Sequence, residues 1–267
     1  MGIAVLQPDI NESRERFSVV VGSTPQSIRF GLTAIKNVGT TVVEAIIAER
    51  DAHGPFRGID DLVMRVRHKD MNRKSLESLA KCGALDKFGE RNALIASIDG
   101  LLAHARESQK QVDTGQKSLF GDAPDEAPSF RLASAEPTQK ADRLRWEKEL
   151  IGLYISEHPL SDYETRLKQE RVVSIKSLRP ISGSTARIAG LVMSSKKIVT
   201  KTGKPMLFSL IEDLTGKIEV VVFPSVLEKT PDAWATNTIV ILSGKLDNRD
   251  GSLKILCDTV KPIATVA

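Results

Sequence analysis

The spacing of apolar residues changes along this chain of 267 residues, and that change limits its fold more than any other feature. Apolar residues recur at helical spacing, broken by glycine turns, from residue 28 to about residue 106. The periodicity disappears between residues 107 and 141, and from Arg187 onward apolar and polar residues alternate. A helical part followed by a β part predicts an α+β protein with two domains.

The segments between these parts complete the predicted organisation. Residues 1–27 are irregular around a short strand-like piece at 17–21, and residues 142–155 regain helical spacing. Residues 107–141 are rich in Gln, Ser, Ala, Pro and acidic residues, a composition that cannot bury enough apolar area to offset the entropy of ordering. We therefore predict an irregular N-terminal region (1–27), an all-α domain (28–106), a flexible linker (107–141), a helical connector (142–182) and a β domain (183–264).

The β domain contains five strand-like segments. They read ARIAGLVMSSKKIV, MLFSLIED, KIEVVVF, TIVILSGKL and SLKILCDTV, with turn signals at LTGK and NRDG. The stretch Pro224–Asn237 before the fourth segment is expected to be partly helical. Five short strands with such an insertion favour a five-stranded β-barrel of the OB-fold type over a sandwich.

A short helix and a longer helix, with a tight hairpin between them, are indicated from residue 32 onward. A helix at Leu32–Ile35 leads through the hairpin to a longer helix near Thr40, with Thr40 or Thr41 as its N-cap. This layout resembles the helix-hairpin-helix motif, although Asn37 stands where glycine is usual; asparagine is the next most tolerant residue for a left-handed backbone. Backbone N–H groups at such a helix N-terminus attract phosphate without reading bases. The predicted phosphate-binding residues are Lys36, Asn37, Val38, Gly39 and Thr40, and a hairpin that only packs is the alternative.

A basic run follows in RVRHKDMNRK. It holds one acid, Asp70, and five basic residues that we expect to track a DNA backbone, namely Arg65, Arg67, Lys69, Arg73 and Lys74. The next helix stops at Gly83 and restarts near Arg91, which indicates a second helix-turn-helix unit and hence a tandem domain. A solvated helix face is the alternative explanation for the charges.

OB-folds that hold single strands combine a basic groove with aromatic residues on which bases stack. The β domain carries the basic residues but few aromatics, so modest affinity is expected. The candidate single-strand-binding residues are Arg187, Lys196, Lys197, Lys201, Lys204, Phe208, Phe223, Arg249 and Lys254. The segment around Phe208 resembles the nucleic-acid-contacting strand of the anticodon-binding barrel in class II aminoacyl-tRNA synthetases, in which a matching Phe stacks on a base. Both phenylalanines could instead belong to the core.

One peptide inside the predicted linker, GQKSLFG, carries the linker's only adjacent pair of large apolar residues. It resembles the bacterial sliding-clamp-binding pentapeptide, Gln-x-(Ser/Asp)-Leu-Phe. The residues that match are Gln116, Ser118, Leu119 and Phe120, and they are the predicted clamp contacts. A partner pocket would bury the two apolar side chains.

The overall composition excludes several classes of protein. Cys82 and Cys257 are isolated, so neither a disulfide framework nor a zinc site is expected. No apolar run approaches the ~20 residues that span a bilayer, and no signal peptide is evident, so we expect a cytoplasmic protein without membrane contact. No Asp/Glu/His cluster has metal-ligand spacing, which argues against a nuclease. A net charge of +4 gives weak support for a phosphate-bearing partner.

Several segments occur in this order in one family. Residues 1–11, residues 28–58, KCGALDKFG, GQKSLFG, WEKELIGLYISEHPL and the five strands are similar to the alpha subunit of bacterial DNA polymerase III in its replicative form. The resemblance implies the end of the fingers at 1–27, a tandem helix-hairpin-helix domain on duplex primer-template, a peptide for the sliding clamp (beta subunit), and an OB domain near single-stranded template. It also implies partnership with the rest of the polymerase III complex.

The same resemblance locates catalysis elsewhere. In that family nucleotidyl transfer uses palm carboxylates that hold Mg²⁺, and no palm-like region is found in this sequence. We therefore expect a fragment with no catalytic residue, no cofactor of its own and no polymerase activity. A free-standing DNA-binding accessory protein of replication or repair is the alternative.

Overall fold

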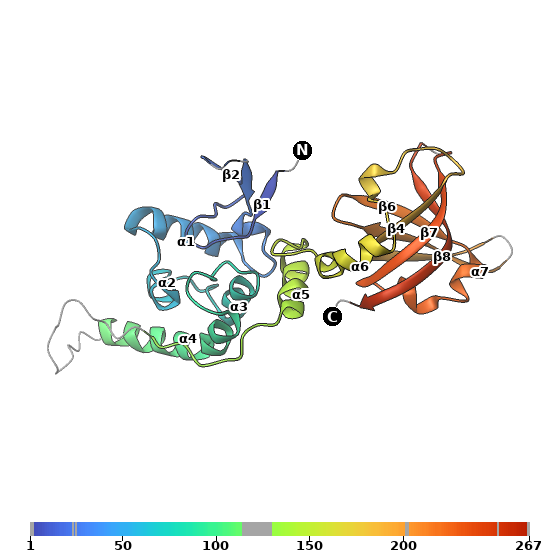
Figure 1. Cartoon of the computed structure of the whole chain (residues 1–267). Coiled ribbons are helices and arrows are strands. Elements are labelled where there is room, and N and C mark those ends of the chain that lie inside the picture. Colours follow the sequence, from blue (N-terminus) through green and yellow to red (C-terminus); the bar gives the residue numbers. More distant parts are fainter. Residues whose placement is uncertain are drawn as a thin grey trace. The chain divides into compact units, whose positions relative to one another are not determined.

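The computed structural model describes residues 3–22, 24, 26–113, 130–200, 203–249 and 251–265. The chain divides into two compact units, Met1–Ser156 and Glu157–Ala267 (Figure 1). Each unit has its own hydrophobic core. Helices dominate the first unit and a barrel dominates the second, so the predicted α+β class with two domains is confirmed. Among the described residues, no helix has the length and apolar character needed to cross a bilayer.

A small sheet opens the first unit. Its strands β1 (Ala4–Leu6), β2 (Ser18–Val20) and β3 (Ser27–Arg29) lie in the order β1-β3-β2, with β1 parallel and β2 antiparallel to β3. The strand-like piece predicted at 17–21 is therefore β2, and it belongs to a three-stranded sheet.

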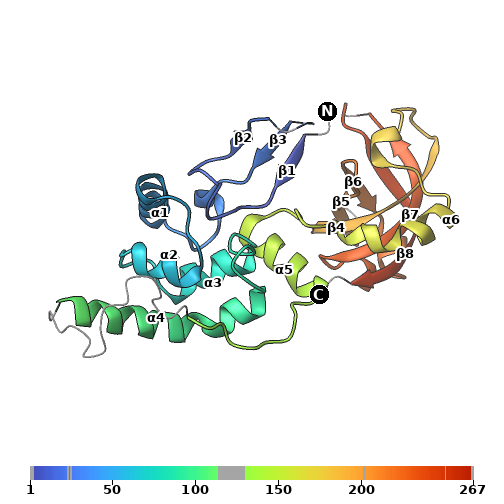
Figure 2. The same cartoon turned by 60° about the vertical axis from the view of Figure 1, so that its left-hand side comes forward.

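Helices make up the rest of the first unit. They are η1 (Leu32–Ala34), α1 (Thr40–His53), α2 (Ile59–Arg65), α3 (Arg73–Lys81), α4 (Arg91–Asp113) and α5 (Lys140–Ile151). One apolar cluster joins them, with Leu32, Ile46, Leu62, Leu76 and Leu94 all fully buried. Figure 2 shows the chain passing from β3 into this helical group.

The predicted flexible linker is wrong at both of its ends. Helix α4 continues to Asp113, and residues 130–139, which we call the strap, lie along the helical unit. The Phe130 N–H donates to Asp60 Oδ2 at 3.2 Å, and the Ala133 N–H donates to Ser97 Oγ at 2.8 Å. Side chains of α2 and α4 thus replace water as partners of the strap backbone, and Phe130 packs on the core. Residues 114–129 lie outside the described residues.

The helical connector predicted at residues 142–182 is split between the two units. Leu150 and Ile151 of α5 are buried in the core of the first unit, and the Leu150 carbonyl accepts from the Lys36 N–H at 2.9 Å. Helix α5 therefore belongs to the helical unit, and the second unit begins at Glu157. The reason is the apolar face of α5, which finds its partner surface on α3 and the first hairpin.

The second unit is a closed barrel. After η2 (Pro159–Tyr163), α6 (Glu164–Gln169) and η3 (Ile175–Ser177) come β4 (Thr185–Val199), β5 (Pro205–Glu212), β6 (Lys217–Val222), α7 (Pro224–Leu227), η4 (Pro231–Trp234), β7 (Thr238–Asp247) and β8 (Lys254–Thr265). All five predicted strands and the partly helical insertion are confirmed.

The strand order identifies the barrel. It is β4-β5-β6-β8-β7, closed by pairing of β7 with β4, with β6 and β8 parallel and the other neighbours antiparallel. This is the five-stranded architecture predicted as an OB-fold. Gly244 sits at a register shift between β7 and β8, and a Cβ there would collide with the Leu256 carbonyl, so glycine permits the close approach of these strands.

Candidate nucleic-acid interface

The first hairpin has the backbone that phosphate binding requires. Asn37 adopts a left-handed conformation with φ 68°, which its short polar side chain tolerates. Helix α1 then begins at Thr40 with Gly39 as its N-cap, at φ −72° and ψ 150°. The prediction of Thr40 or Thr41 as N-cap is wrong, because the hairpin ends one residue earlier than threonine capping would need.

Four backbone amides have no acceptor at this helix end among the residues that the structure describes, and no side chain caps α1. They are the N–H groups of Gly39, Thr40, Thr41 and Val42; the first three belong to exposed residues, whereas Val42 is buried. By contrast, the Lys36 N–H donates to Leu150 and the Val38 N–H donates to the Ile35 carbonyl at 3.2 Å.

Of the five predicted residues, Lys36 and Val38 therefore use their backbone N–H groups within the protein, whereas no acceptor is found for those of Asn37, Gly39 and Thr40 among the described residues. Thr41 is a further open donor that sequence reasoning missed. Lys36 is exposed, so only its side chain is available to a partner.

Gly39 leaves this helix end accessible. Its φ and ψ suit any residue, and a Cβ there would meet only Thr41 Oγ1, at 3.9 Å. Packing within the protein therefore does not demand a glycine. What the missing side chain provides is clear access to the three amides, where the helix dipole also favours an anion.

Side-chain bonds fix the first hairpin next to the basic run. Asn37 Nδ2 donates to Ser78 Oγ of α3 at 3.2 Å, and Thr41 Oγ1 donates to Asp70 Oδ2 at 3.4 Å. The open end of α1 and the turn between α2 and α3 thus form one surface.

The N-termini of α3 and α4 are already capped. Asn72 accepts from the N–H groups of Lys74 and Ser75 and completes a capping box on α3. Glu90 accepts from the N–H groups of Asn92 and Ala93 at the start of α4, at 2.7 and 3.2 Å. An internal carboxylate therefore occupies the anion position of α4.

Glu90 also binds the strap. Its carboxylate accepts from the Thr138 N–H at 2.7 Å and from the Thr138 hydroxyl. Partial burial by itself would raise the pKa of Glu90, but the hydrogen bonds from Thr138, Ala93 and Asn92 outweigh it and lower that pKa.

Buried Arg91 holds the turn between α3 and α4. Its guanidinium makes two 2.8 Å bonds to Asp86 and one of 2.9 Å to the Lys81 carbonyl, and it faces Glu147 of α5 at 3.7 Å. The predicted second helix-turn-helix unit is therefore present, but the charge of Arg91 is used by bonds within the protein and is not available to DNA.

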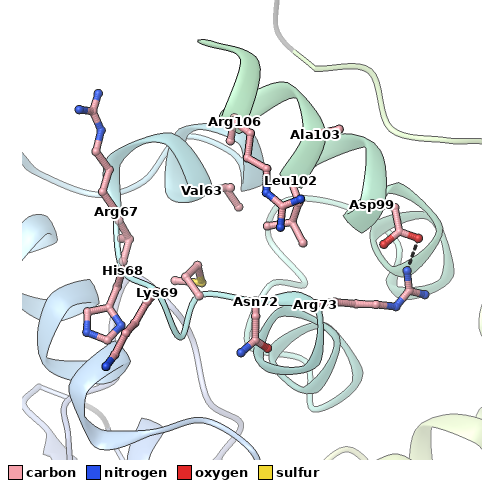
Figure 3. Close-up of a pocket in the computed structure, with 13 residues that line it drawn as sticks. Val63, Arg67, His68, Lys69, Asn72, Arg73, Asp99, Leu102, Ala103 and Arg106 are labelled. Atoms are coloured by element: carbon pink, nitrogen blue, oxygen red, sulfur yellow. Dashed lines mark hydrogen bonds and ion pairs between the residues drawn. The ribbon is translucent and has the colours of Figure 1, made fainter. Parts of the chain in front are cut away.

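A groove of about 890 Å³ lies between the α2–α3 turn and α4 (Figure 3). Arg67, Lys69 and Arg73 line it and are exposed, and Arg73 forms an ion pair with Asp99 of α4. Arg106, which sequence reasoning missed, points into the groove from α4 in Figure 3. Lys74 is exposed beside it on α3. The charges form a basic surface next to the open end of α1.

Arg65 is a correction to the predicted phosphate contacts. Its guanidinium bonds Glu49 Oε1 at 3.1 Å, Asp61 Oδ2 at 3.1 Å and the carbonyls of Glu49, Gly54 and Pro55. It also lies 4.5 Å from the Phe56 ring centre. All five N–H donors of an arginine are accounted for, so Arg65 joins α1 to α2 instead of reaching a ligand.

The barrel places Phe208 on its outer face. On β5, Leu207, Ser209 and Ile211 point inward and are buried, whereas Phe208 alternates with them and is half-buried. Its cross-strand neighbour on β4 is Lys196. The interpretation of Phe208 as a core residue is therefore wrong, because the pleat turns it outward.

Lys254 completes a group around this ring. Its Nζ lies 6.0 Å from the Phe208 ring centre and 3.2 Å from Glu219. Phe223 follows β6 directly and is 42% exposed, so it is not a core residue either. Aromatic faces next to lysines on the β5–β6 side of an OB barrel suit stacked bases and phosphates.

The other predicted single-strand-binding residues of the barrel do not all lie on one side of it. Lys197 and Lys204 are exposed at the end of β4 and the start of β5, and Arg249 is exposed in the turn before β8. Lys201 lies outside the described residues. Arg187 pairs with Ser243 on the β4–β7 side and forms an ion pair with Glu170, so the structure does not place it with Phe208.

The predicted clamp contacts, Gln116, Ser118, Leu119 and Phe120, also lie outside the described residues.

Two family models match the chain. A helix-hairpin-helix motif model matches residues 2–94, and an OB-fold nucleic acid binding domain model matches residues 186–263. Each match falls within one of the two compact units.

Curated relatives match nearly the whole chain. DNA polymerase III subunit alpha of Pasteurella multocida is 34% identical over 261 residues, covering 96% of this chain and 22% of the relative. The same subunit of Thermus aquaticus is 38% identical over 228 residues, covering 84% of this chain and 18% of the relative. The chain thus spans about a fifth of the length of these relatives.

Solved structures that match the chain cover about a third of it. An asparaginyl-tRNA synthetase from Pyrococcus horikoshii is 26% identical with a TM-score of 0.31, over 36% of this chain and 24% of that one. A domain of replication protein A from Methanococcus maripaludis is 21% identical with a TM-score of 0.31, over 36% of this chain and 98% of that one.

Proposed function

Since this chain belongs, as a segment, to the family of DNA polymerase III alpha subunits, we propose that it grips primed DNA during replication. The helical unit holds the sugar-phosphate backbone of the duplex, and the barrel holds a neighbouring single strand. A DNA-binding role in replication follows from the family; which strand each unit contacts is the finer proposal.

The open end of α1 carries the duplex part of the proposal. Gly39, Thr40 and Thr41 offer three backbone donors to one phosphate, next to the basic groove of the α2–α3 turn. Backbone donors contact phosphates without reading base edges, so duplex binding is independent of sequence. Neutralised phosphates release counterions, so the affinity falls as salt rises.

The outer face of the barrel carries the single-strand part. Phe208 and Phe223 offer ring faces, while Lys196, Lys204 and Lys254 offer charges for the intervening phosphates. With two aromatic residues on this face, we propose binding of moderate affinity and little sequence preference.

The peptide at 116–120 is proposed to bind the sliding clamp. Asp113 ends α4 and Phe130 begins the strap, so both flanks of residues 114–129 are attached to the helical unit. A peptide tethered to a unit already on DNA reaches an effective concentration in the mM range, so a weak contact gives a durable attachment.

Nucleotidyl transfer is proposed to belong to other parts of the family's longer proteins. Among the described residues, no group of three His, Cys, Asp or Glu side chains could hold a metal ion. We assign this chain a binding role within the polymerase III complex, in the bacterial cytoplasm where the chromosome is copied.

Fluorescence anisotropy with three labelled probes tests the proposal. The probes are a blunt duplex, an oligo-dT strand, and a primed duplex with a single-stranded overhang. The primed duplex should bind more tightly than either of the others, because it engages both units. Equal affinity for all three at low salt, or no binding, would overturn the assignment.

A further inference from the structure

A second groove system lies in the barrel unit, away from the Phe208 face. One part, of about 400 Å³, is lined by three arginines, Arg171, Arg179 and Arg187, and by apolar side chains that include Ile181. A second part, of about 290 Å³, is lined by apolar residues of η2, α6 and the turn after β5, including Leu160, Leu167 and Leu214, and also by the charged residues Glu164, Lys168 and Asp213. Val173 lines both parts, so they adjoin.

Apolar side chains in this system are unusually open to solvent. Val173 is 44% exposed, Leu214 is 54% exposed and Ile181 is 61% exposed. Exposed apolar residues that gather at a hollow, rimmed by charges, are typical of surfaces that bind another molecule. Leu160, at 2% exposure, forms part of the wall on the η2 side.

The basic residues of the first part indicate which kind of ligand this groove would bind. Every basic residue that lines it is an arginine, whereas the Phe208 face uses lysines. Arginine is preferred where planar carboxylates are bound by two parallel bonds and at the centres of protein interfaces, where lysine is depleted. Arg187 already binds the carboxylate of Glu170, while Arg171 and Arg179 have no ion-pair partner among the described residues.

Nucleic acid fits this surface less well. No aromatic side chain lines either part, so bases would have no ring to stack on, and Lys168, the basic residue that lines the second part, forms an ion pair with Glu164. An apolar hollow next to unpaired arginines matches a peptide that carries a large apolar residue beside Asp or Glu. Charge complementarity and the apolar lining thus agree on the same occupant.

We propose that this groove is a docking site for an acidic peptide of a partner protein. A large apolar side chain of the peptide enters the hollow between Leu167 and Leu214, and its carboxylates pair with Arg171 and Arg179. This role is independent of DNA binding by the Phe208 face and goes beyond the proposed function.

A displayed library of random peptides of about twelve residues, selected against the full chain, tests the proposal. Enriched peptides should combine an excess of Asp and Glu with one large apolar residue. Arg171→Glu/Arg179→Glu should weaken the best peptide at least about tenfold, because reversed charges repel its carboxylates. Leu214→Asp, at an exposed turn position, should weaken it as well by placing a charge at the apolar hollow.

The charge-matched control is Lys204→Glu/Arg249→Glu, which reverses two charges proposed to face DNA. It should weaken oligo-dT binding and leave the peptide unaffected, whereas Arg171→Glu/Arg179→Glu should leave oligo-dT binding within about twofold. Thermal melts confirm that each variant is folded. Enriched peptides without acidic residues, or equal binding to both double variants, would overturn the proposal. Loss of oligo-dT binding in Arg171→Glu/Arg179→Glu would reassign the groove to the single strand.

Discussion

Replacing Gly39 by aspartate should separate folding from DNA binding. Aspartate is favoured over glycine at a helix N-cap by a few tenths of a kcal/mol, and its charge suits the helix dipole. The backbone at Gly39 admits any residue, and the new Cβ meets nothing closer than 3.9 Å. Gly39→Asp should therefore leave the helical unit as stable as before, or more stable by about 0.5 kcal/mol.

The same change should remove the proposed phosphate site. The new carboxylate would accept from the amides of α1, as Glu90 does at the start of α4. Hydrogen bonds to a charged group contribute about 1.5–3 kcal/mol, and this site is exposed, so the lower end applies. Duplex affinity should fall about tenfold for every sequence, and the slope of log affinity against log salt should decrease by about one.

Gln139→Asp is the matched control for this experiment. Gln139 is the N-cap of α5 at φ −68° and ψ 149°, is exposed and makes no side-chain cap, so it reproduces the geometry of Gly39 outside the hairpin. Anisotropy should show unchanged duplex binding for Gln139→Asp. If Gly39→Asp bound duplex with wild-type affinity and salt slope, or if both variants lost binding equally, the phosphate role of the α1 end would be refuted.

Four further outcomes are expected. Phe208→Ala should weaken oligo-dT binding about tenfold in a titration while the melting temperature stays close to wild type, because the ring lies outside the barrel core; an unchanged affinity would return Phe208 to a packing role. Leu119→Ala/Phe120→Ala should abolish binding to the sliding clamp in a pull-down without changing DNA affinity, and retained clamp binding would exclude the peptide. Arg91→Met should cost about 3–5 kcal/mol in urea unfolding, because two carboxylates lose their buried partner, and a loss below about 1 kcal/mol would contradict this. Because the folded pKa of Glu90 is lowered, its stabilising contribution is present above its ordinary pKa, near about 4.3, and is lost as the pH falls through the lowered value; Glu90→Gln should flatten that part of the acid-unfolding curve, and an unaltered curve would count against the strap contact.

The barrel strands were predictable because the alternation of apolar and polar residues follows directly from strand geometry. Alternation along β5 follows the pleat, so Leu207 and Ile211 had to share a face that Phe208 could not. The uncertainty over Phe208 came from its alternation in step with Met206 and Leu210, which are themselves on the outer face. Both faces of β5 are apolar, and only the structure of the closed barrel shows which of them points inward.

The strap was not predictable, because its order does not come from its own apolar content. Glu90 and Ser97, which are distant in sequence, satisfy its backbone, and only Phe130 and Leu132 add packing. The amino-acid composition of a segment does not include hydrogen bonds to distant residues, so the composition of this segment predicted disorder. The two apolar residues at alternate positions were the one available signal.

The site residues show a similar limit. A run of basic residues cannot tell which arginine is satisfied within the protein, and Arg65 is, although Asp61 four residues before it was a hint. Arg106 lines the same groove as Arg67, Lys69 and Arg73 but comes from α4, so no local sequence pattern includes it. The hairpin at Asn37 and Gly39 was predictable from the sequence because a left-handed backbone and an open helix end restrict which residues can stand there.

An amide-resolved NMR titration with a short blunt duplex tests the central assignment most directly. The N–H signals of Gly39, Thr40 and Thr41 should shift the most, equally for two unrelated sequences, and the shifts should vanish as salt is raised. The amides of Asn92 and Ala93, already bonded to Glu90, should stay in place. Unmoved signals at Gly39–Thr41 in a spectrum that otherwise shows duplex binding would contradict the account.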